Sequence, residues 1–169
     1  MMLALALVLS TVAAYQPRVP DVEVVTQDGR RVHFYSDLVQ GRTVAINFVF
    51  TNCSTICPVS GALFADLQKR SDRGVHLISV SIDPETDTPR KLAAWSRRFR
   101  SGDGGGDWTL VTGDRPSIDR LLAALGAPPG RPQDHAPLTI IGNDATHSWK
   151  RFYGMPGAKQ LDAMFEEVR

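Results

Sequence analysis

Two short apolar runs, residues 43–50 (TVAINFVF) and residues 75–82 (VHLISVSI), restrict the fold of this 169-residue chain more than any other feature. Both are rich in valine, isoleucine and phenylalanine, which is typical of strands that are covered on both faces. A helical pattern lies between them and starts at Pro58, a residue that suits the first turn of a helix. Such a unit forms a right-handed crossover between parallel strands. The sequence therefore predicts an open α/β fold.

The rest of the chain continues the alternation of strands and helices. Period-two valines on either side of an Asp-Gly turn predict an early hairpin. The later segments read, in chain order, as a helix from Pro89, a strand at 108–111, a helix at 116–125, a closing hairpin of strands at 138–141 and 149–153, and a last helix at 157–168. We therefore predict an α/β, thioredoxin-like three-layer sandwich with an N-terminal β-hairpin.

Two segments are predicted to lack regular structure. Residues 101–106 (SGDGGG) are expected to form a mobile loop, because glycine clusters interrupt both helices and strands. Residues 127–137 contain four prolines and are also expected to be irregular.

The composition is that of one compact globular domain. Hydrophobic residues make up 43% and charged residues 22% of the chain, and its length is sufficient for a single core. The formal net charge is +1, and the sequence has no basic stripe with interleaved aromatic residues. Nucleic acid is therefore not an expected partner.

The first fourteen residues, MMLALALVLSTVAA, are uncharged and almost entirely apolar. This length fits the apolar region of a signal peptide and is short of the about 20 residues that span a bilayer. No lysine or arginine precedes the run, so a short uncleaved anchor and a buried helix of the domain stay open as alternatives. We assign residues 1–16 to a signal peptide or short membrane anchor and residues 17–169 to the folded domain.

Cys53 and Cys57 are the only cysteines of the chain, and they lie where the first apolar strand ends and the helix begins. A strand-to-helix turn places side chains at the carboxyl ends of the strands, where open α/β folds bind ligands. The start of a helix also stabilises a thiolate, so we expect Cys57 to be more ionised than a free thiol. Val59, Leu63 and Leu67 recur every four residues and predict the apolar face of this helix.

Three kinds of chemistry are open to such a cysteine pair. A structural disulfide would close a very short loop and would stabilise the fold little. A redox pair or a metal site would each use ionised sulfur. Three residues separate the cysteines, one more than in the thioredoxin motif, and this wider spacing favours an ion between the sulfurs.

Several segments, in order along the chain, resemble the Sco/SenC family of copper-binding, thioredoxin-fold proteins. They are the Asp-Gly hairpin, GRTVAINF leading to FTNCSTICP, then SIDPETDTP, and Asp-His before a late strand. Together they cover most of the chain after the apolar leader. The resemblance implies that residues 17–169 form a Sco domain.

The resemblance also implies a metal site formed by Cys53, Cys57 and His135, with copper as the metal. Thiolates favour Cu(I) and imidazole accepts both Cu(I) and Cu(II), whereas zinc would prefer a fourth ligand. Asp134 is a candidate acceptor for the second ring nitrogen of His135. His147 is the alternative third ligand.

Other residues near these motifs have weaker predicted roles. His33 and His76 are expected to face solvent or to be satisfied by local partners. Asp83 and Pro84 are expected at the same end of the sheet as the cysteines, either in a functional role or simply as a helix-entry turn. Pro137 departs from the family pattern and is similar to the cis-proline of thiol oxidoreductases, which favours a redox role.

The predicted function is that of a copper metallochaperone in the bacterial periplasm or cell envelope. The resemblance implies that its partners are the copper-site subunit of a respiratory terminal oxidase and a second copper chaperone. An anchor at the N-terminus would attach the domain to the membrane. The alternative is an envelope thiol-disulfide oxidoreductase that uses Cys53 and Cys57 as a redox pair to reduce the copper-ligand cysteines of a partner. A peroxidase of the peroxiredoxin type is a more distant third candidate, and whether the protein is an enzyme stays open.

Overall fold

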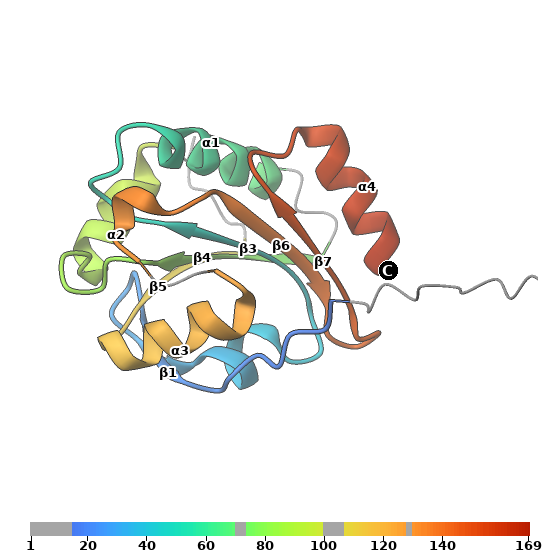
Figure 1. Cartoon of the computed structure of the whole chain (residues 1–169), viewed down its shortest axis with the longest axis horizontal. Coiled ribbons are helices and arrows are strands. Elements are labelled where there is room, and N and C mark those ends of the chain that lie inside the picture. Colours follow the sequence, from blue (N-terminus) through green and yellow to red (C-terminus); the bar gives the residue numbers. More distant parts are fainter. Residues whose placement is uncertain (1–14, 70–73, 100–106, 128–129) are drawn as a thin grey trace, which may run out of the picture.

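The computed structural model describes residues 15–69, 74–99, 107–127 and 130–169. Its centre is a seven-stranded sheet in the order β2-β1-β5-β4-β3-β6-β7 (Figure 1). The strands are β1 (Glu23–Thr26), β2 (Arg31–His33), β3 (Thr43–Val49), β4 (Val75–Ser81), β5 (Trp108–Thr112), β6 (Leu138–Asn143) and β7 (Ser148–Tyr153). The helices are α1 (Ile56–Lys69), α2 (Pro89–Arg97), α3 (Arg115–Leu125) and α4 (Ala158–Val168), with a π-helical segment η1 (Phe34–Val39) and a 3₁₀ turn η3 (Pro132–Asp134).

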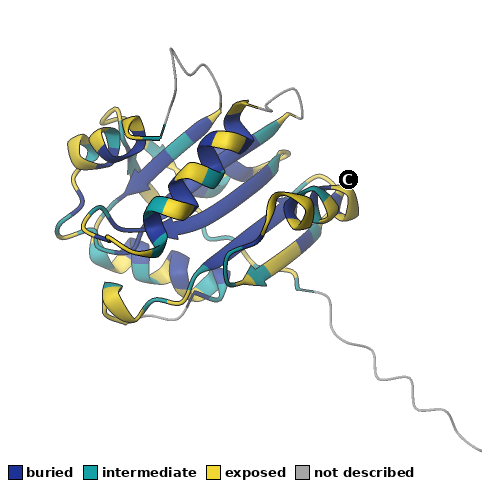
Figure 2. Ribbon diagram, turned by 90° about the horizontal axis from the view of Figure 1, so that it is seen from above, coloured by how far each residue is buried: buried dark blue, intermediate teal, exposed yellow. Residues whose placement is uncertain are grey.

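The two apolar runs form the parallel centre of the sheet, as predicted. Strands β3 and β4 pair in parallel from Thr43↔Val75 to Val49↔Ser81, with α1 as the crossover between them. Every residue of both strands after the first is buried, which explains their almost continuous apolar sequence (Figure 2). The N-terminal hairpin is also confirmed, since β1 and β2 pair antiparallel.

Helices cover both faces of the sheet, so the three-layer sandwich is confirmed. Helices α1 and α4 lie on one face and α3 lies on the other (Figure 1). Helix α2 packs beside α1, because Trp95 of α2 and Phe64 of α1 both contact the ring of Trp108, with centroid distances of 6.3 and 6.1 Å. Thr88 caps α2 by accepting a hydrogen bond from the Lys91 N–H.

The predicted apolar face of α1 is confirmed only in part, because Leu67 is buried and Leu63 packs partly buried against the core, but Val59 does not. Val59 is 58% exposed, whereas the buried residues of this helix include the small Ser60 and Gly61. A Cβ atom on Gly61 would lie only 2.6 Å from the ring of Phe99 and 2.9 Å from that of Trp95. The helix therefore packs through its small residues, which allow α2 to approach closely.

Other boundaries differ slightly from the predictions. Helix α1 begins at Ile56, two residues before Pro58. The segment 127–137 contains the 3₁₀ turn η3 where irregular structure was expected throughout. The glycine-rich residues 101–106 and the apolar residues 1–14 lie outside the described residues. Within the described part of the chain, no helix is long and apolar enough to cross a membrane.

Candidate metal centre

The sheet topology brings several functional candidates to one end of the sheet. Strands β3, β4 and β5 run parallel and finish at this end, and β6 starts there because it pairs antiparallel with β3, Asn47 lying opposite Thr139. The loops that carry Cys53, Asp87 and His135 follow β3, follow β4 and precede β6, respectively. We call this end of the sheet the cysteine end.

The two cysteines are free thiols held against each other by the first turn of α1. Cys53 lies in the turn after β3, and Cys57 is the second residue of the helix. The Cys57 backbone N–H donates a hydrogen bond to Cys53 Sγ at 3.3 Å, and Thr55 Oγ1 lies 3.7 Å from the same sulfur. Both cysteines are buried. The prediction that they share one strand-to-helix turn is therefore confirmed.

The pKa of Cys57 is raised, whereas the sequence predicted a more readily ionised thiol. Burial acts to raise the pKa of Cys53, but hydrogen bonds from Cys57 and Thr55 outweigh it and lower this pKa below its usual value. Burial, the hydrogen bond to Cys53 and the nearby Asp87 charge raise the pKa of Cys57 to about 12. Cys53 is therefore the sulfur that ionises first, because burial outweighs the helix start at Cys57.

Asp87 is a buried carboxylate that the sequence analysis did not single out. It is 0% exposed and accepts hydrogen bonds from the Thr51 N–H at 3.1 Å, the Thr51 hydroxyl at 2.6 Å and the Ser81 hydroxyl at 2.7 Å. These bonds tie the loop after β4 to the residues just before Cys53. In the sequence, Asp87 is the second aspartate of the DPETDTP segment. A helix-entry turn and cap already explained this segment, so the sequence analysis did not assign Asp87 a role.

Asp83 forms the helix-entry turn that the sequence analysis gave as the alternative to a functional role. Its carbonyl oxygen accepts hydrogen bonds from the backbone N–H groups of Thr86 at 3.0 Å and Asp87 at 2.8 Å. This turn presents the Asp87 side chain to the cysteine loop. A direct functional role of Asp83 stays a prediction.

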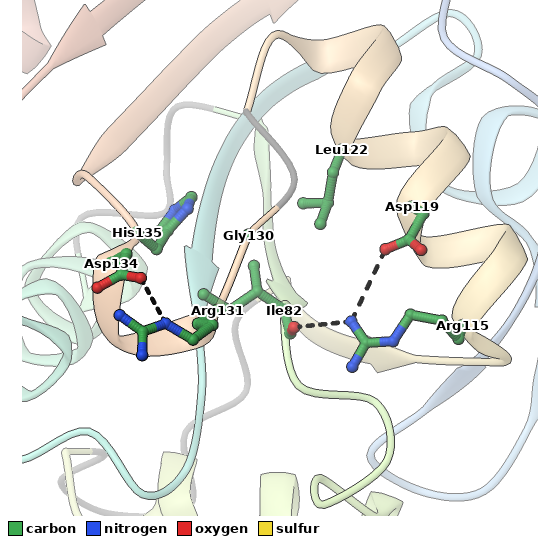
Figure 3. A pocket seen from close by; sticks show the side chains of 8 residues that line it. All are labelled: Ile82, Arg115, Asp119, Leu122, Gly130, Arg131, Asp134 and His135. Atoms are coloured by element: carbon green, nitrogen blue, oxygen red, sulfur yellow. Dashed lines mark hydrogen bonds and ion pairs between the residues drawn. The ribbon is translucent and has the colours of Figure 1, made fainter.

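His135 lies at the cysteine end, where its ring packs on β3. The centroids of the His135 and Phe48 rings are 5.8 Å apart in an edge-to-face arrangement. The residue borders a pocket of about 90 Å³ beside the start of α3 (Figure 3). Its Nε2 atom is buried and has no hydrogen-bond partner in the part of the chain that the structure describes. Burial lowers the pKa of the His135 imidazole, so the ring is held in the neutral form that binds metals.

Asp134 does not serve as the predicted acceptor for His135. Its carboxylate pairs instead with the Arg131 guanidinium, at 2.7 Å (Figure 3). The pairing follows from the 3₁₀ turn η3, which brings residues three apart onto one side. Among the described residues, no carboxylate is therefore hydrogen-bonded to the His135 Nε2 atom to orient the ring, as often happens in metal-binding histidines.

The structure does not assemble the complete predicted ligand set. Among the described residues, no three histidine, cysteine, aspartate or glutamate side chains are close enough to hold a metal ion together. It brings Cys53 and Cys57 together and places His135 at the same end of the sheet. The three as a metal site stay a prediction.

The other histidines are poor candidates for the third ligand. His76 is 2% exposed, and its ring nitrogens lie 2.8 Å from the Leu38 carbonyl oxygen and 2.9 Å from the Thr109 hydroxyl, so the expected local partners are confirmed. His33 is exposed at the end of β2. His147 follows β6, whose last residue pairs with the first residue of β3, so it lies at the end of the sheet opposite to the cysteines.

Pro137 does not share the backbone geometry of the oxidoreductase proline. No cis peptide bond occurs among the described residues, so the bond before Pro137 is trans. The similarity that favoured a redox role for this residue is therefore not confirmed.

The donor atoms at the cysteine end fit a soft metal ion. Two sulfurs from adjacent free thiols supply the ligands that favour Cu(I), and a neutral imidazole with an unpaired Nε2 supplies one that also accepts Cu(II). These three donors, two thiols and one imidazole, are less suited to a closed tetrahedral zinc site, which takes four ligands.

Comparisons with known proteins agree with this arrangement. The SCO1 protein homolog of Bacillus subtilis is 38% identical over 91 residues, which are 52% of this chain and 45% of that protein. A protein of Stutzerimonas stutzeri described as copper-binding is 31% identical over 114 residues, covering 65% of this chain and 52% of its own length. The chain thus spans about half the length of these curated relatives.

Solved structures share the fold over almost the whole chain. A SCO1/SenC family lipoprotein from Bacillus anthracis has a TM-score of 0.72 at 24% identity, covering 92% of this chain and 97% of its own. BsSco, described as a member of the Sco family of cytochrome c oxidase assembly proteins with a disulfide switch, has a TM-score of 0.72 at 27% identity, with 91% and 93% covered. Arabidopsis thaliana ScoI, solved with copper bound, has a TM-score of 0.68 at 21% identity, with 86% and 94% covered.

The similarity is specific as well as extensive. A sequence model described as SCO1/SenC matches residues 14–147, which include both cysteines, Asp87 and His135. The chain belongs to the SCO1/SenC family.

Proposed function

We propose that this chain is a copper chaperone that binds one copper ion through Cys53, Cys57 and His135. The observation that carries the proposal is the set of soft and borderline donors at the cysteine end: two free thiols in one turn and a buried imidazole nitrogen that has no partner among the described residues. Relatives described as copper-binding or solved with copper bound support the choice of metal.

The protein residues have distinct parts in taking up the ion. Cys53 ionises first and provides the initial thiolate, since its pKa is lowered, whereas Cys57 must release its proton as copper binds. Asp87 holds the loop before Cys53 through Thr51 and so fixes the position of the first sulfur. His135, in the loop before β6, supplies the third ligand.

We further propose that the copper is delivered to the copper-site subunit of a respiratory oxidase, with another copper chaperone as its source. The location is the bacterial periplasm or cell envelope, with residues 1–16 as signal peptide or short anchor. The similar BsSco belongs to a family described as cytochrome c oxidase assembly proteins, and the similar Bacillus anthracis protein is described as a lipoprotein.

Anaerobic titration of the reduced chain with Cu(I), combined with thiol counting, tests the metal site. We expect one copper per chain, because the sequence contains one pair of cysteines. Cys53→Ser and Cys57→Ser are each expected to abolish tight Cu(I) binding. Ser54→Ala is the matched control in the same turn and should bind normally. Wild-type affinity in Cys57→Ser would exclude a two-thiolate site.

The second candidate is a thiol-disulfide oxidoreductase, and the difference between the two thiols favours it. A lowered pKa on Cys53 and a raised pKa on Cys57 are the properties of an attacking and a resolving cysteine. In this reaction Cys53 would attack a partner disulfide, and Cys57 would release the partner thiol by closing a Cys53–Cys57 disulfide. Reduction of a model disulfide by the copper-free protein measures this activity, and each cysteine variant should lose full turnover.

A further inference from the structure

Asn47 interrupts the apolar sequence of β3, TVAINFV, inside the strand. The residue is only 1% exposed, and asparagine is depleted in strands. Burying an amide costs free energy unless its polar atoms are hydrogen-bonded. The partners of Asn47 therefore indicate why this position is polar.

Asn47 belongs to a chain of buried hydrogen bonds that runs across three strands to helix α1. The Trp108 indole N–H donates to the Ser79 hydroxyl at 3.0 Å, and this hydroxyl donates to Asn47 Oδ1 at 2.6 Å. The Asn47 Nδ2 group then donates to the Ser60 hydroxyl oxygen at 2.6 Å. Each of the four residues is at most 9% exposed. Since Ser79 pairs with Asn47 in the parallel ladder of β3 and β4, the sheet fixes the strand side of this chain.

The last bond of this chain closes the segment that carries both cysteines. Asn47 and Ser60 are 13 residues apart in sequence, and Cys53 and Cys57 lie between them. Asn47 belongs to the strand that leads to Cys53, and Ser60 lies about one turn after Cys57, with both residues on the buried side of α1. The bond therefore joins the two ends of this segment at its base, whereas Asp87 holds the loop just before Cys53.

The bond between Asn47 and Ser60 fixes where α1 lies on the sheet. Apolar packing is non-directional, whereas a hydrogen bond restricts both distance and angle, so it sets the position of the helix along the strand. The first turn of α1 is also bonded through the Cys57 N–H to Cys53 Sγ, but the proposed function assigns this sulfur to copper. The bond between Asn47 and Ser60 uses no metal ligand, so it holds the helix both before and after an ion binds.

We propose that Asn47 and Ser60 are positioning residues that hold the Cys53 and Cys57 sulfurs in one arrangement before an ion binds. They act through the backbone of α1 and of the segment 47–60. Ligands that are already in place lose less conformational freedom on binding, so the affinity is higher. The use of this arrangement for copper rests on the proposed function. The restraint on the cysteine segment does not.

Competitive Cu(I) titration of the reduced full chain and its variants tests this inference. Ser60→Ala removes the acceptor and keeps a residue that favours helix, and Asn47→Ala removes the donor. Each should weaken Cu(I) binding about fivefold or more, within the range of coupling between contacting residues, and should shift the thiolate-to-Cu(II) absorption. The double variant should bind no more weakly than the weaker single variant, because all three lack the same bond. Should Asn47→Ala fail to fold, Ser60→Ala decides the outcome.

Ser117→Ala is the matched control. Ser117 is also 9% exposed and lies in the first turn of a helix, but this helix is α3 and the hydroxyl bonds to Asp114 at 2.8 Å. The variant should keep the wild-type Cu(I) affinity. Urea denaturation verifies that every variant is folded under the titration conditions. Wild-type affinity in Ser60→Ala, or a double variant whose loss is the product of the two single losses, would overturn the proposal.

Alkylation of the copper-free protein separates this inference from the proposed function. In a Cys53→Ser background Cys57 is the only thiol, and iodoacetamide reaches this buried residue when the start of α1 opens locally. Adding Ser60→Ala should raise the alkylation rate at least about fivefold, whereas adding Ser117→Ala should not. If the wild type failed to bind copper and Ser60→Ala still accelerated alkylation, the positioning role would stand while the copper function fell. Equal rates in the two variants would refute the positioning role whether or not copper binds.

Discussion

The two ends of the central sheet differ in how completely their buried polar groups are hydrogen-bonded. At the end opposite to the cysteines, the buried His76 has partners for both ring nitrogens, and the Asp144 carboxylate accepts a hydrogen bond from the Gly41 N–H at 2.8 Å. At the cysteine end, the Nε2 atom of His135 and the hydroxyl of Thr112 are buried and have no hydrogen-bond partner in the described part of the chain, and the two cysteines are free thiols. Polar groups of native proteins are normally paired, so an unpaired imidazole nitrogen at the same end of the sheet as two free thiols marks a candidate ligand site.

The difference also concerns stability. A satisfied polar group supports the fold, whereas an unsatisfied group lowers stability until a ligand binds. Asp87 is the exception at the cysteine end, because it is fully buried and accepts several hydrogen bonds. Through its bonds to Thr51 it holds the loop that carries Cys53 in place. Substitutions can therefore separate the supporting groups from the ligand-binding groups.

The largest expected effect on stability comes from removing the support. Asp87→Ala leaves the Thr51 N–H and the hydroxyls of Thr51 and Ser81 without their acceptor, which should lower the free energy of unfolding by about 3 kcal/mol. Urea denaturation of the reduced protein measures this loss. Asp28→Ala in the exposed turn should change stability by less than about 0.5 kcal/mol. A comparable small change in Asp87→Ala would mean that the carboxylate is dispensable for the loop.

The second prediction compares histidines at opposite ends. His135→Ala should weaken Cu(II) binding by about a hundredfold or more and change the thiolate-to-copper absorption, because imidazole is the ligand that suits Cu(II). Reduction of a model disulfide by the cysteines should be nearly unaffected. His147→Ala should alter neither property. If His147→Ala removed the Cu(II) spectrum and His135→Ala spared it, the third ligand would be reversed.

The third prediction separates the two sulfurs within the cysteine end. At neutral pH, iodoacetamide should modify Cys53 at least about tenfold faster than Cys57, because the thiolate is the reactive form and the pKa of Cys57 is raised to about 12. The rate at Cys53 should rise with pH through a midpoint below the usual thiol value. Mass spectrometry of each modified cysteine after short reaction times measures the ratio. Preferential labelling of Cys57 would reverse the roles.

Much of the fold was predictable because the sequence carries strong local signals. The structure agrees with the predicted buried runs of β3 and β4, the Asp-Gly hairpin, the start of α2 at Pro89 and the end of α3 at Leu125. The orientation of α1 was not predictable in this way. Its buried face depends on how closely Gly61 can approach Trp95 and Phe99, which are more than thirty residues away in sequence.

The chemistry of the site was predictable only in part, for a related reason. The cysteine pair and the placement of His135 follow from local motifs and from the order of the strands. The pKa values of Cys53 and Cys57 depend on burial and on the Asp87 charge, which no local pattern reports. The pairing of Asp134 with Arg131 likewise arises from the 3₁₀ turn and not from the Asp-His neighbourhood in the sequence.

The smallest predicted effect lies at the end of the sheet opposite to the cysteines and concerns His76. Burial is the main cause that lowers the pKa of this imidazole in the folded state, with the Leu38 carbonyl and Asp107 opposing it and Arg42 adding to it. The unfolded chain therefore binds more protons below about pH 6.5, the ordinary histidine pKa, and stability should fall as the pH drops from there toward the folded pKa.

One titrating group adds at most about 1.4 kcal/mol per pH unit to this slope, and His135, whose pKa burial also lowers, contributes with the same sign, so urea midpoints at pH 7, 6 and 5 are compared between the wild type and the variants. His76→Gln can keep a hydrogen bond to the Leu38 carbonyl oxygen but cannot titrate, and its stability should therefore decline less over this range than that of the wild type. His33→Gln makes the same substitution at an exposed position at the end of β2 and is the matched control. Parallel curves for His76→Gln and the wild type would show that acid weakens the fold at groups other than His76, and the prediction for this end of the sheet would be wrong.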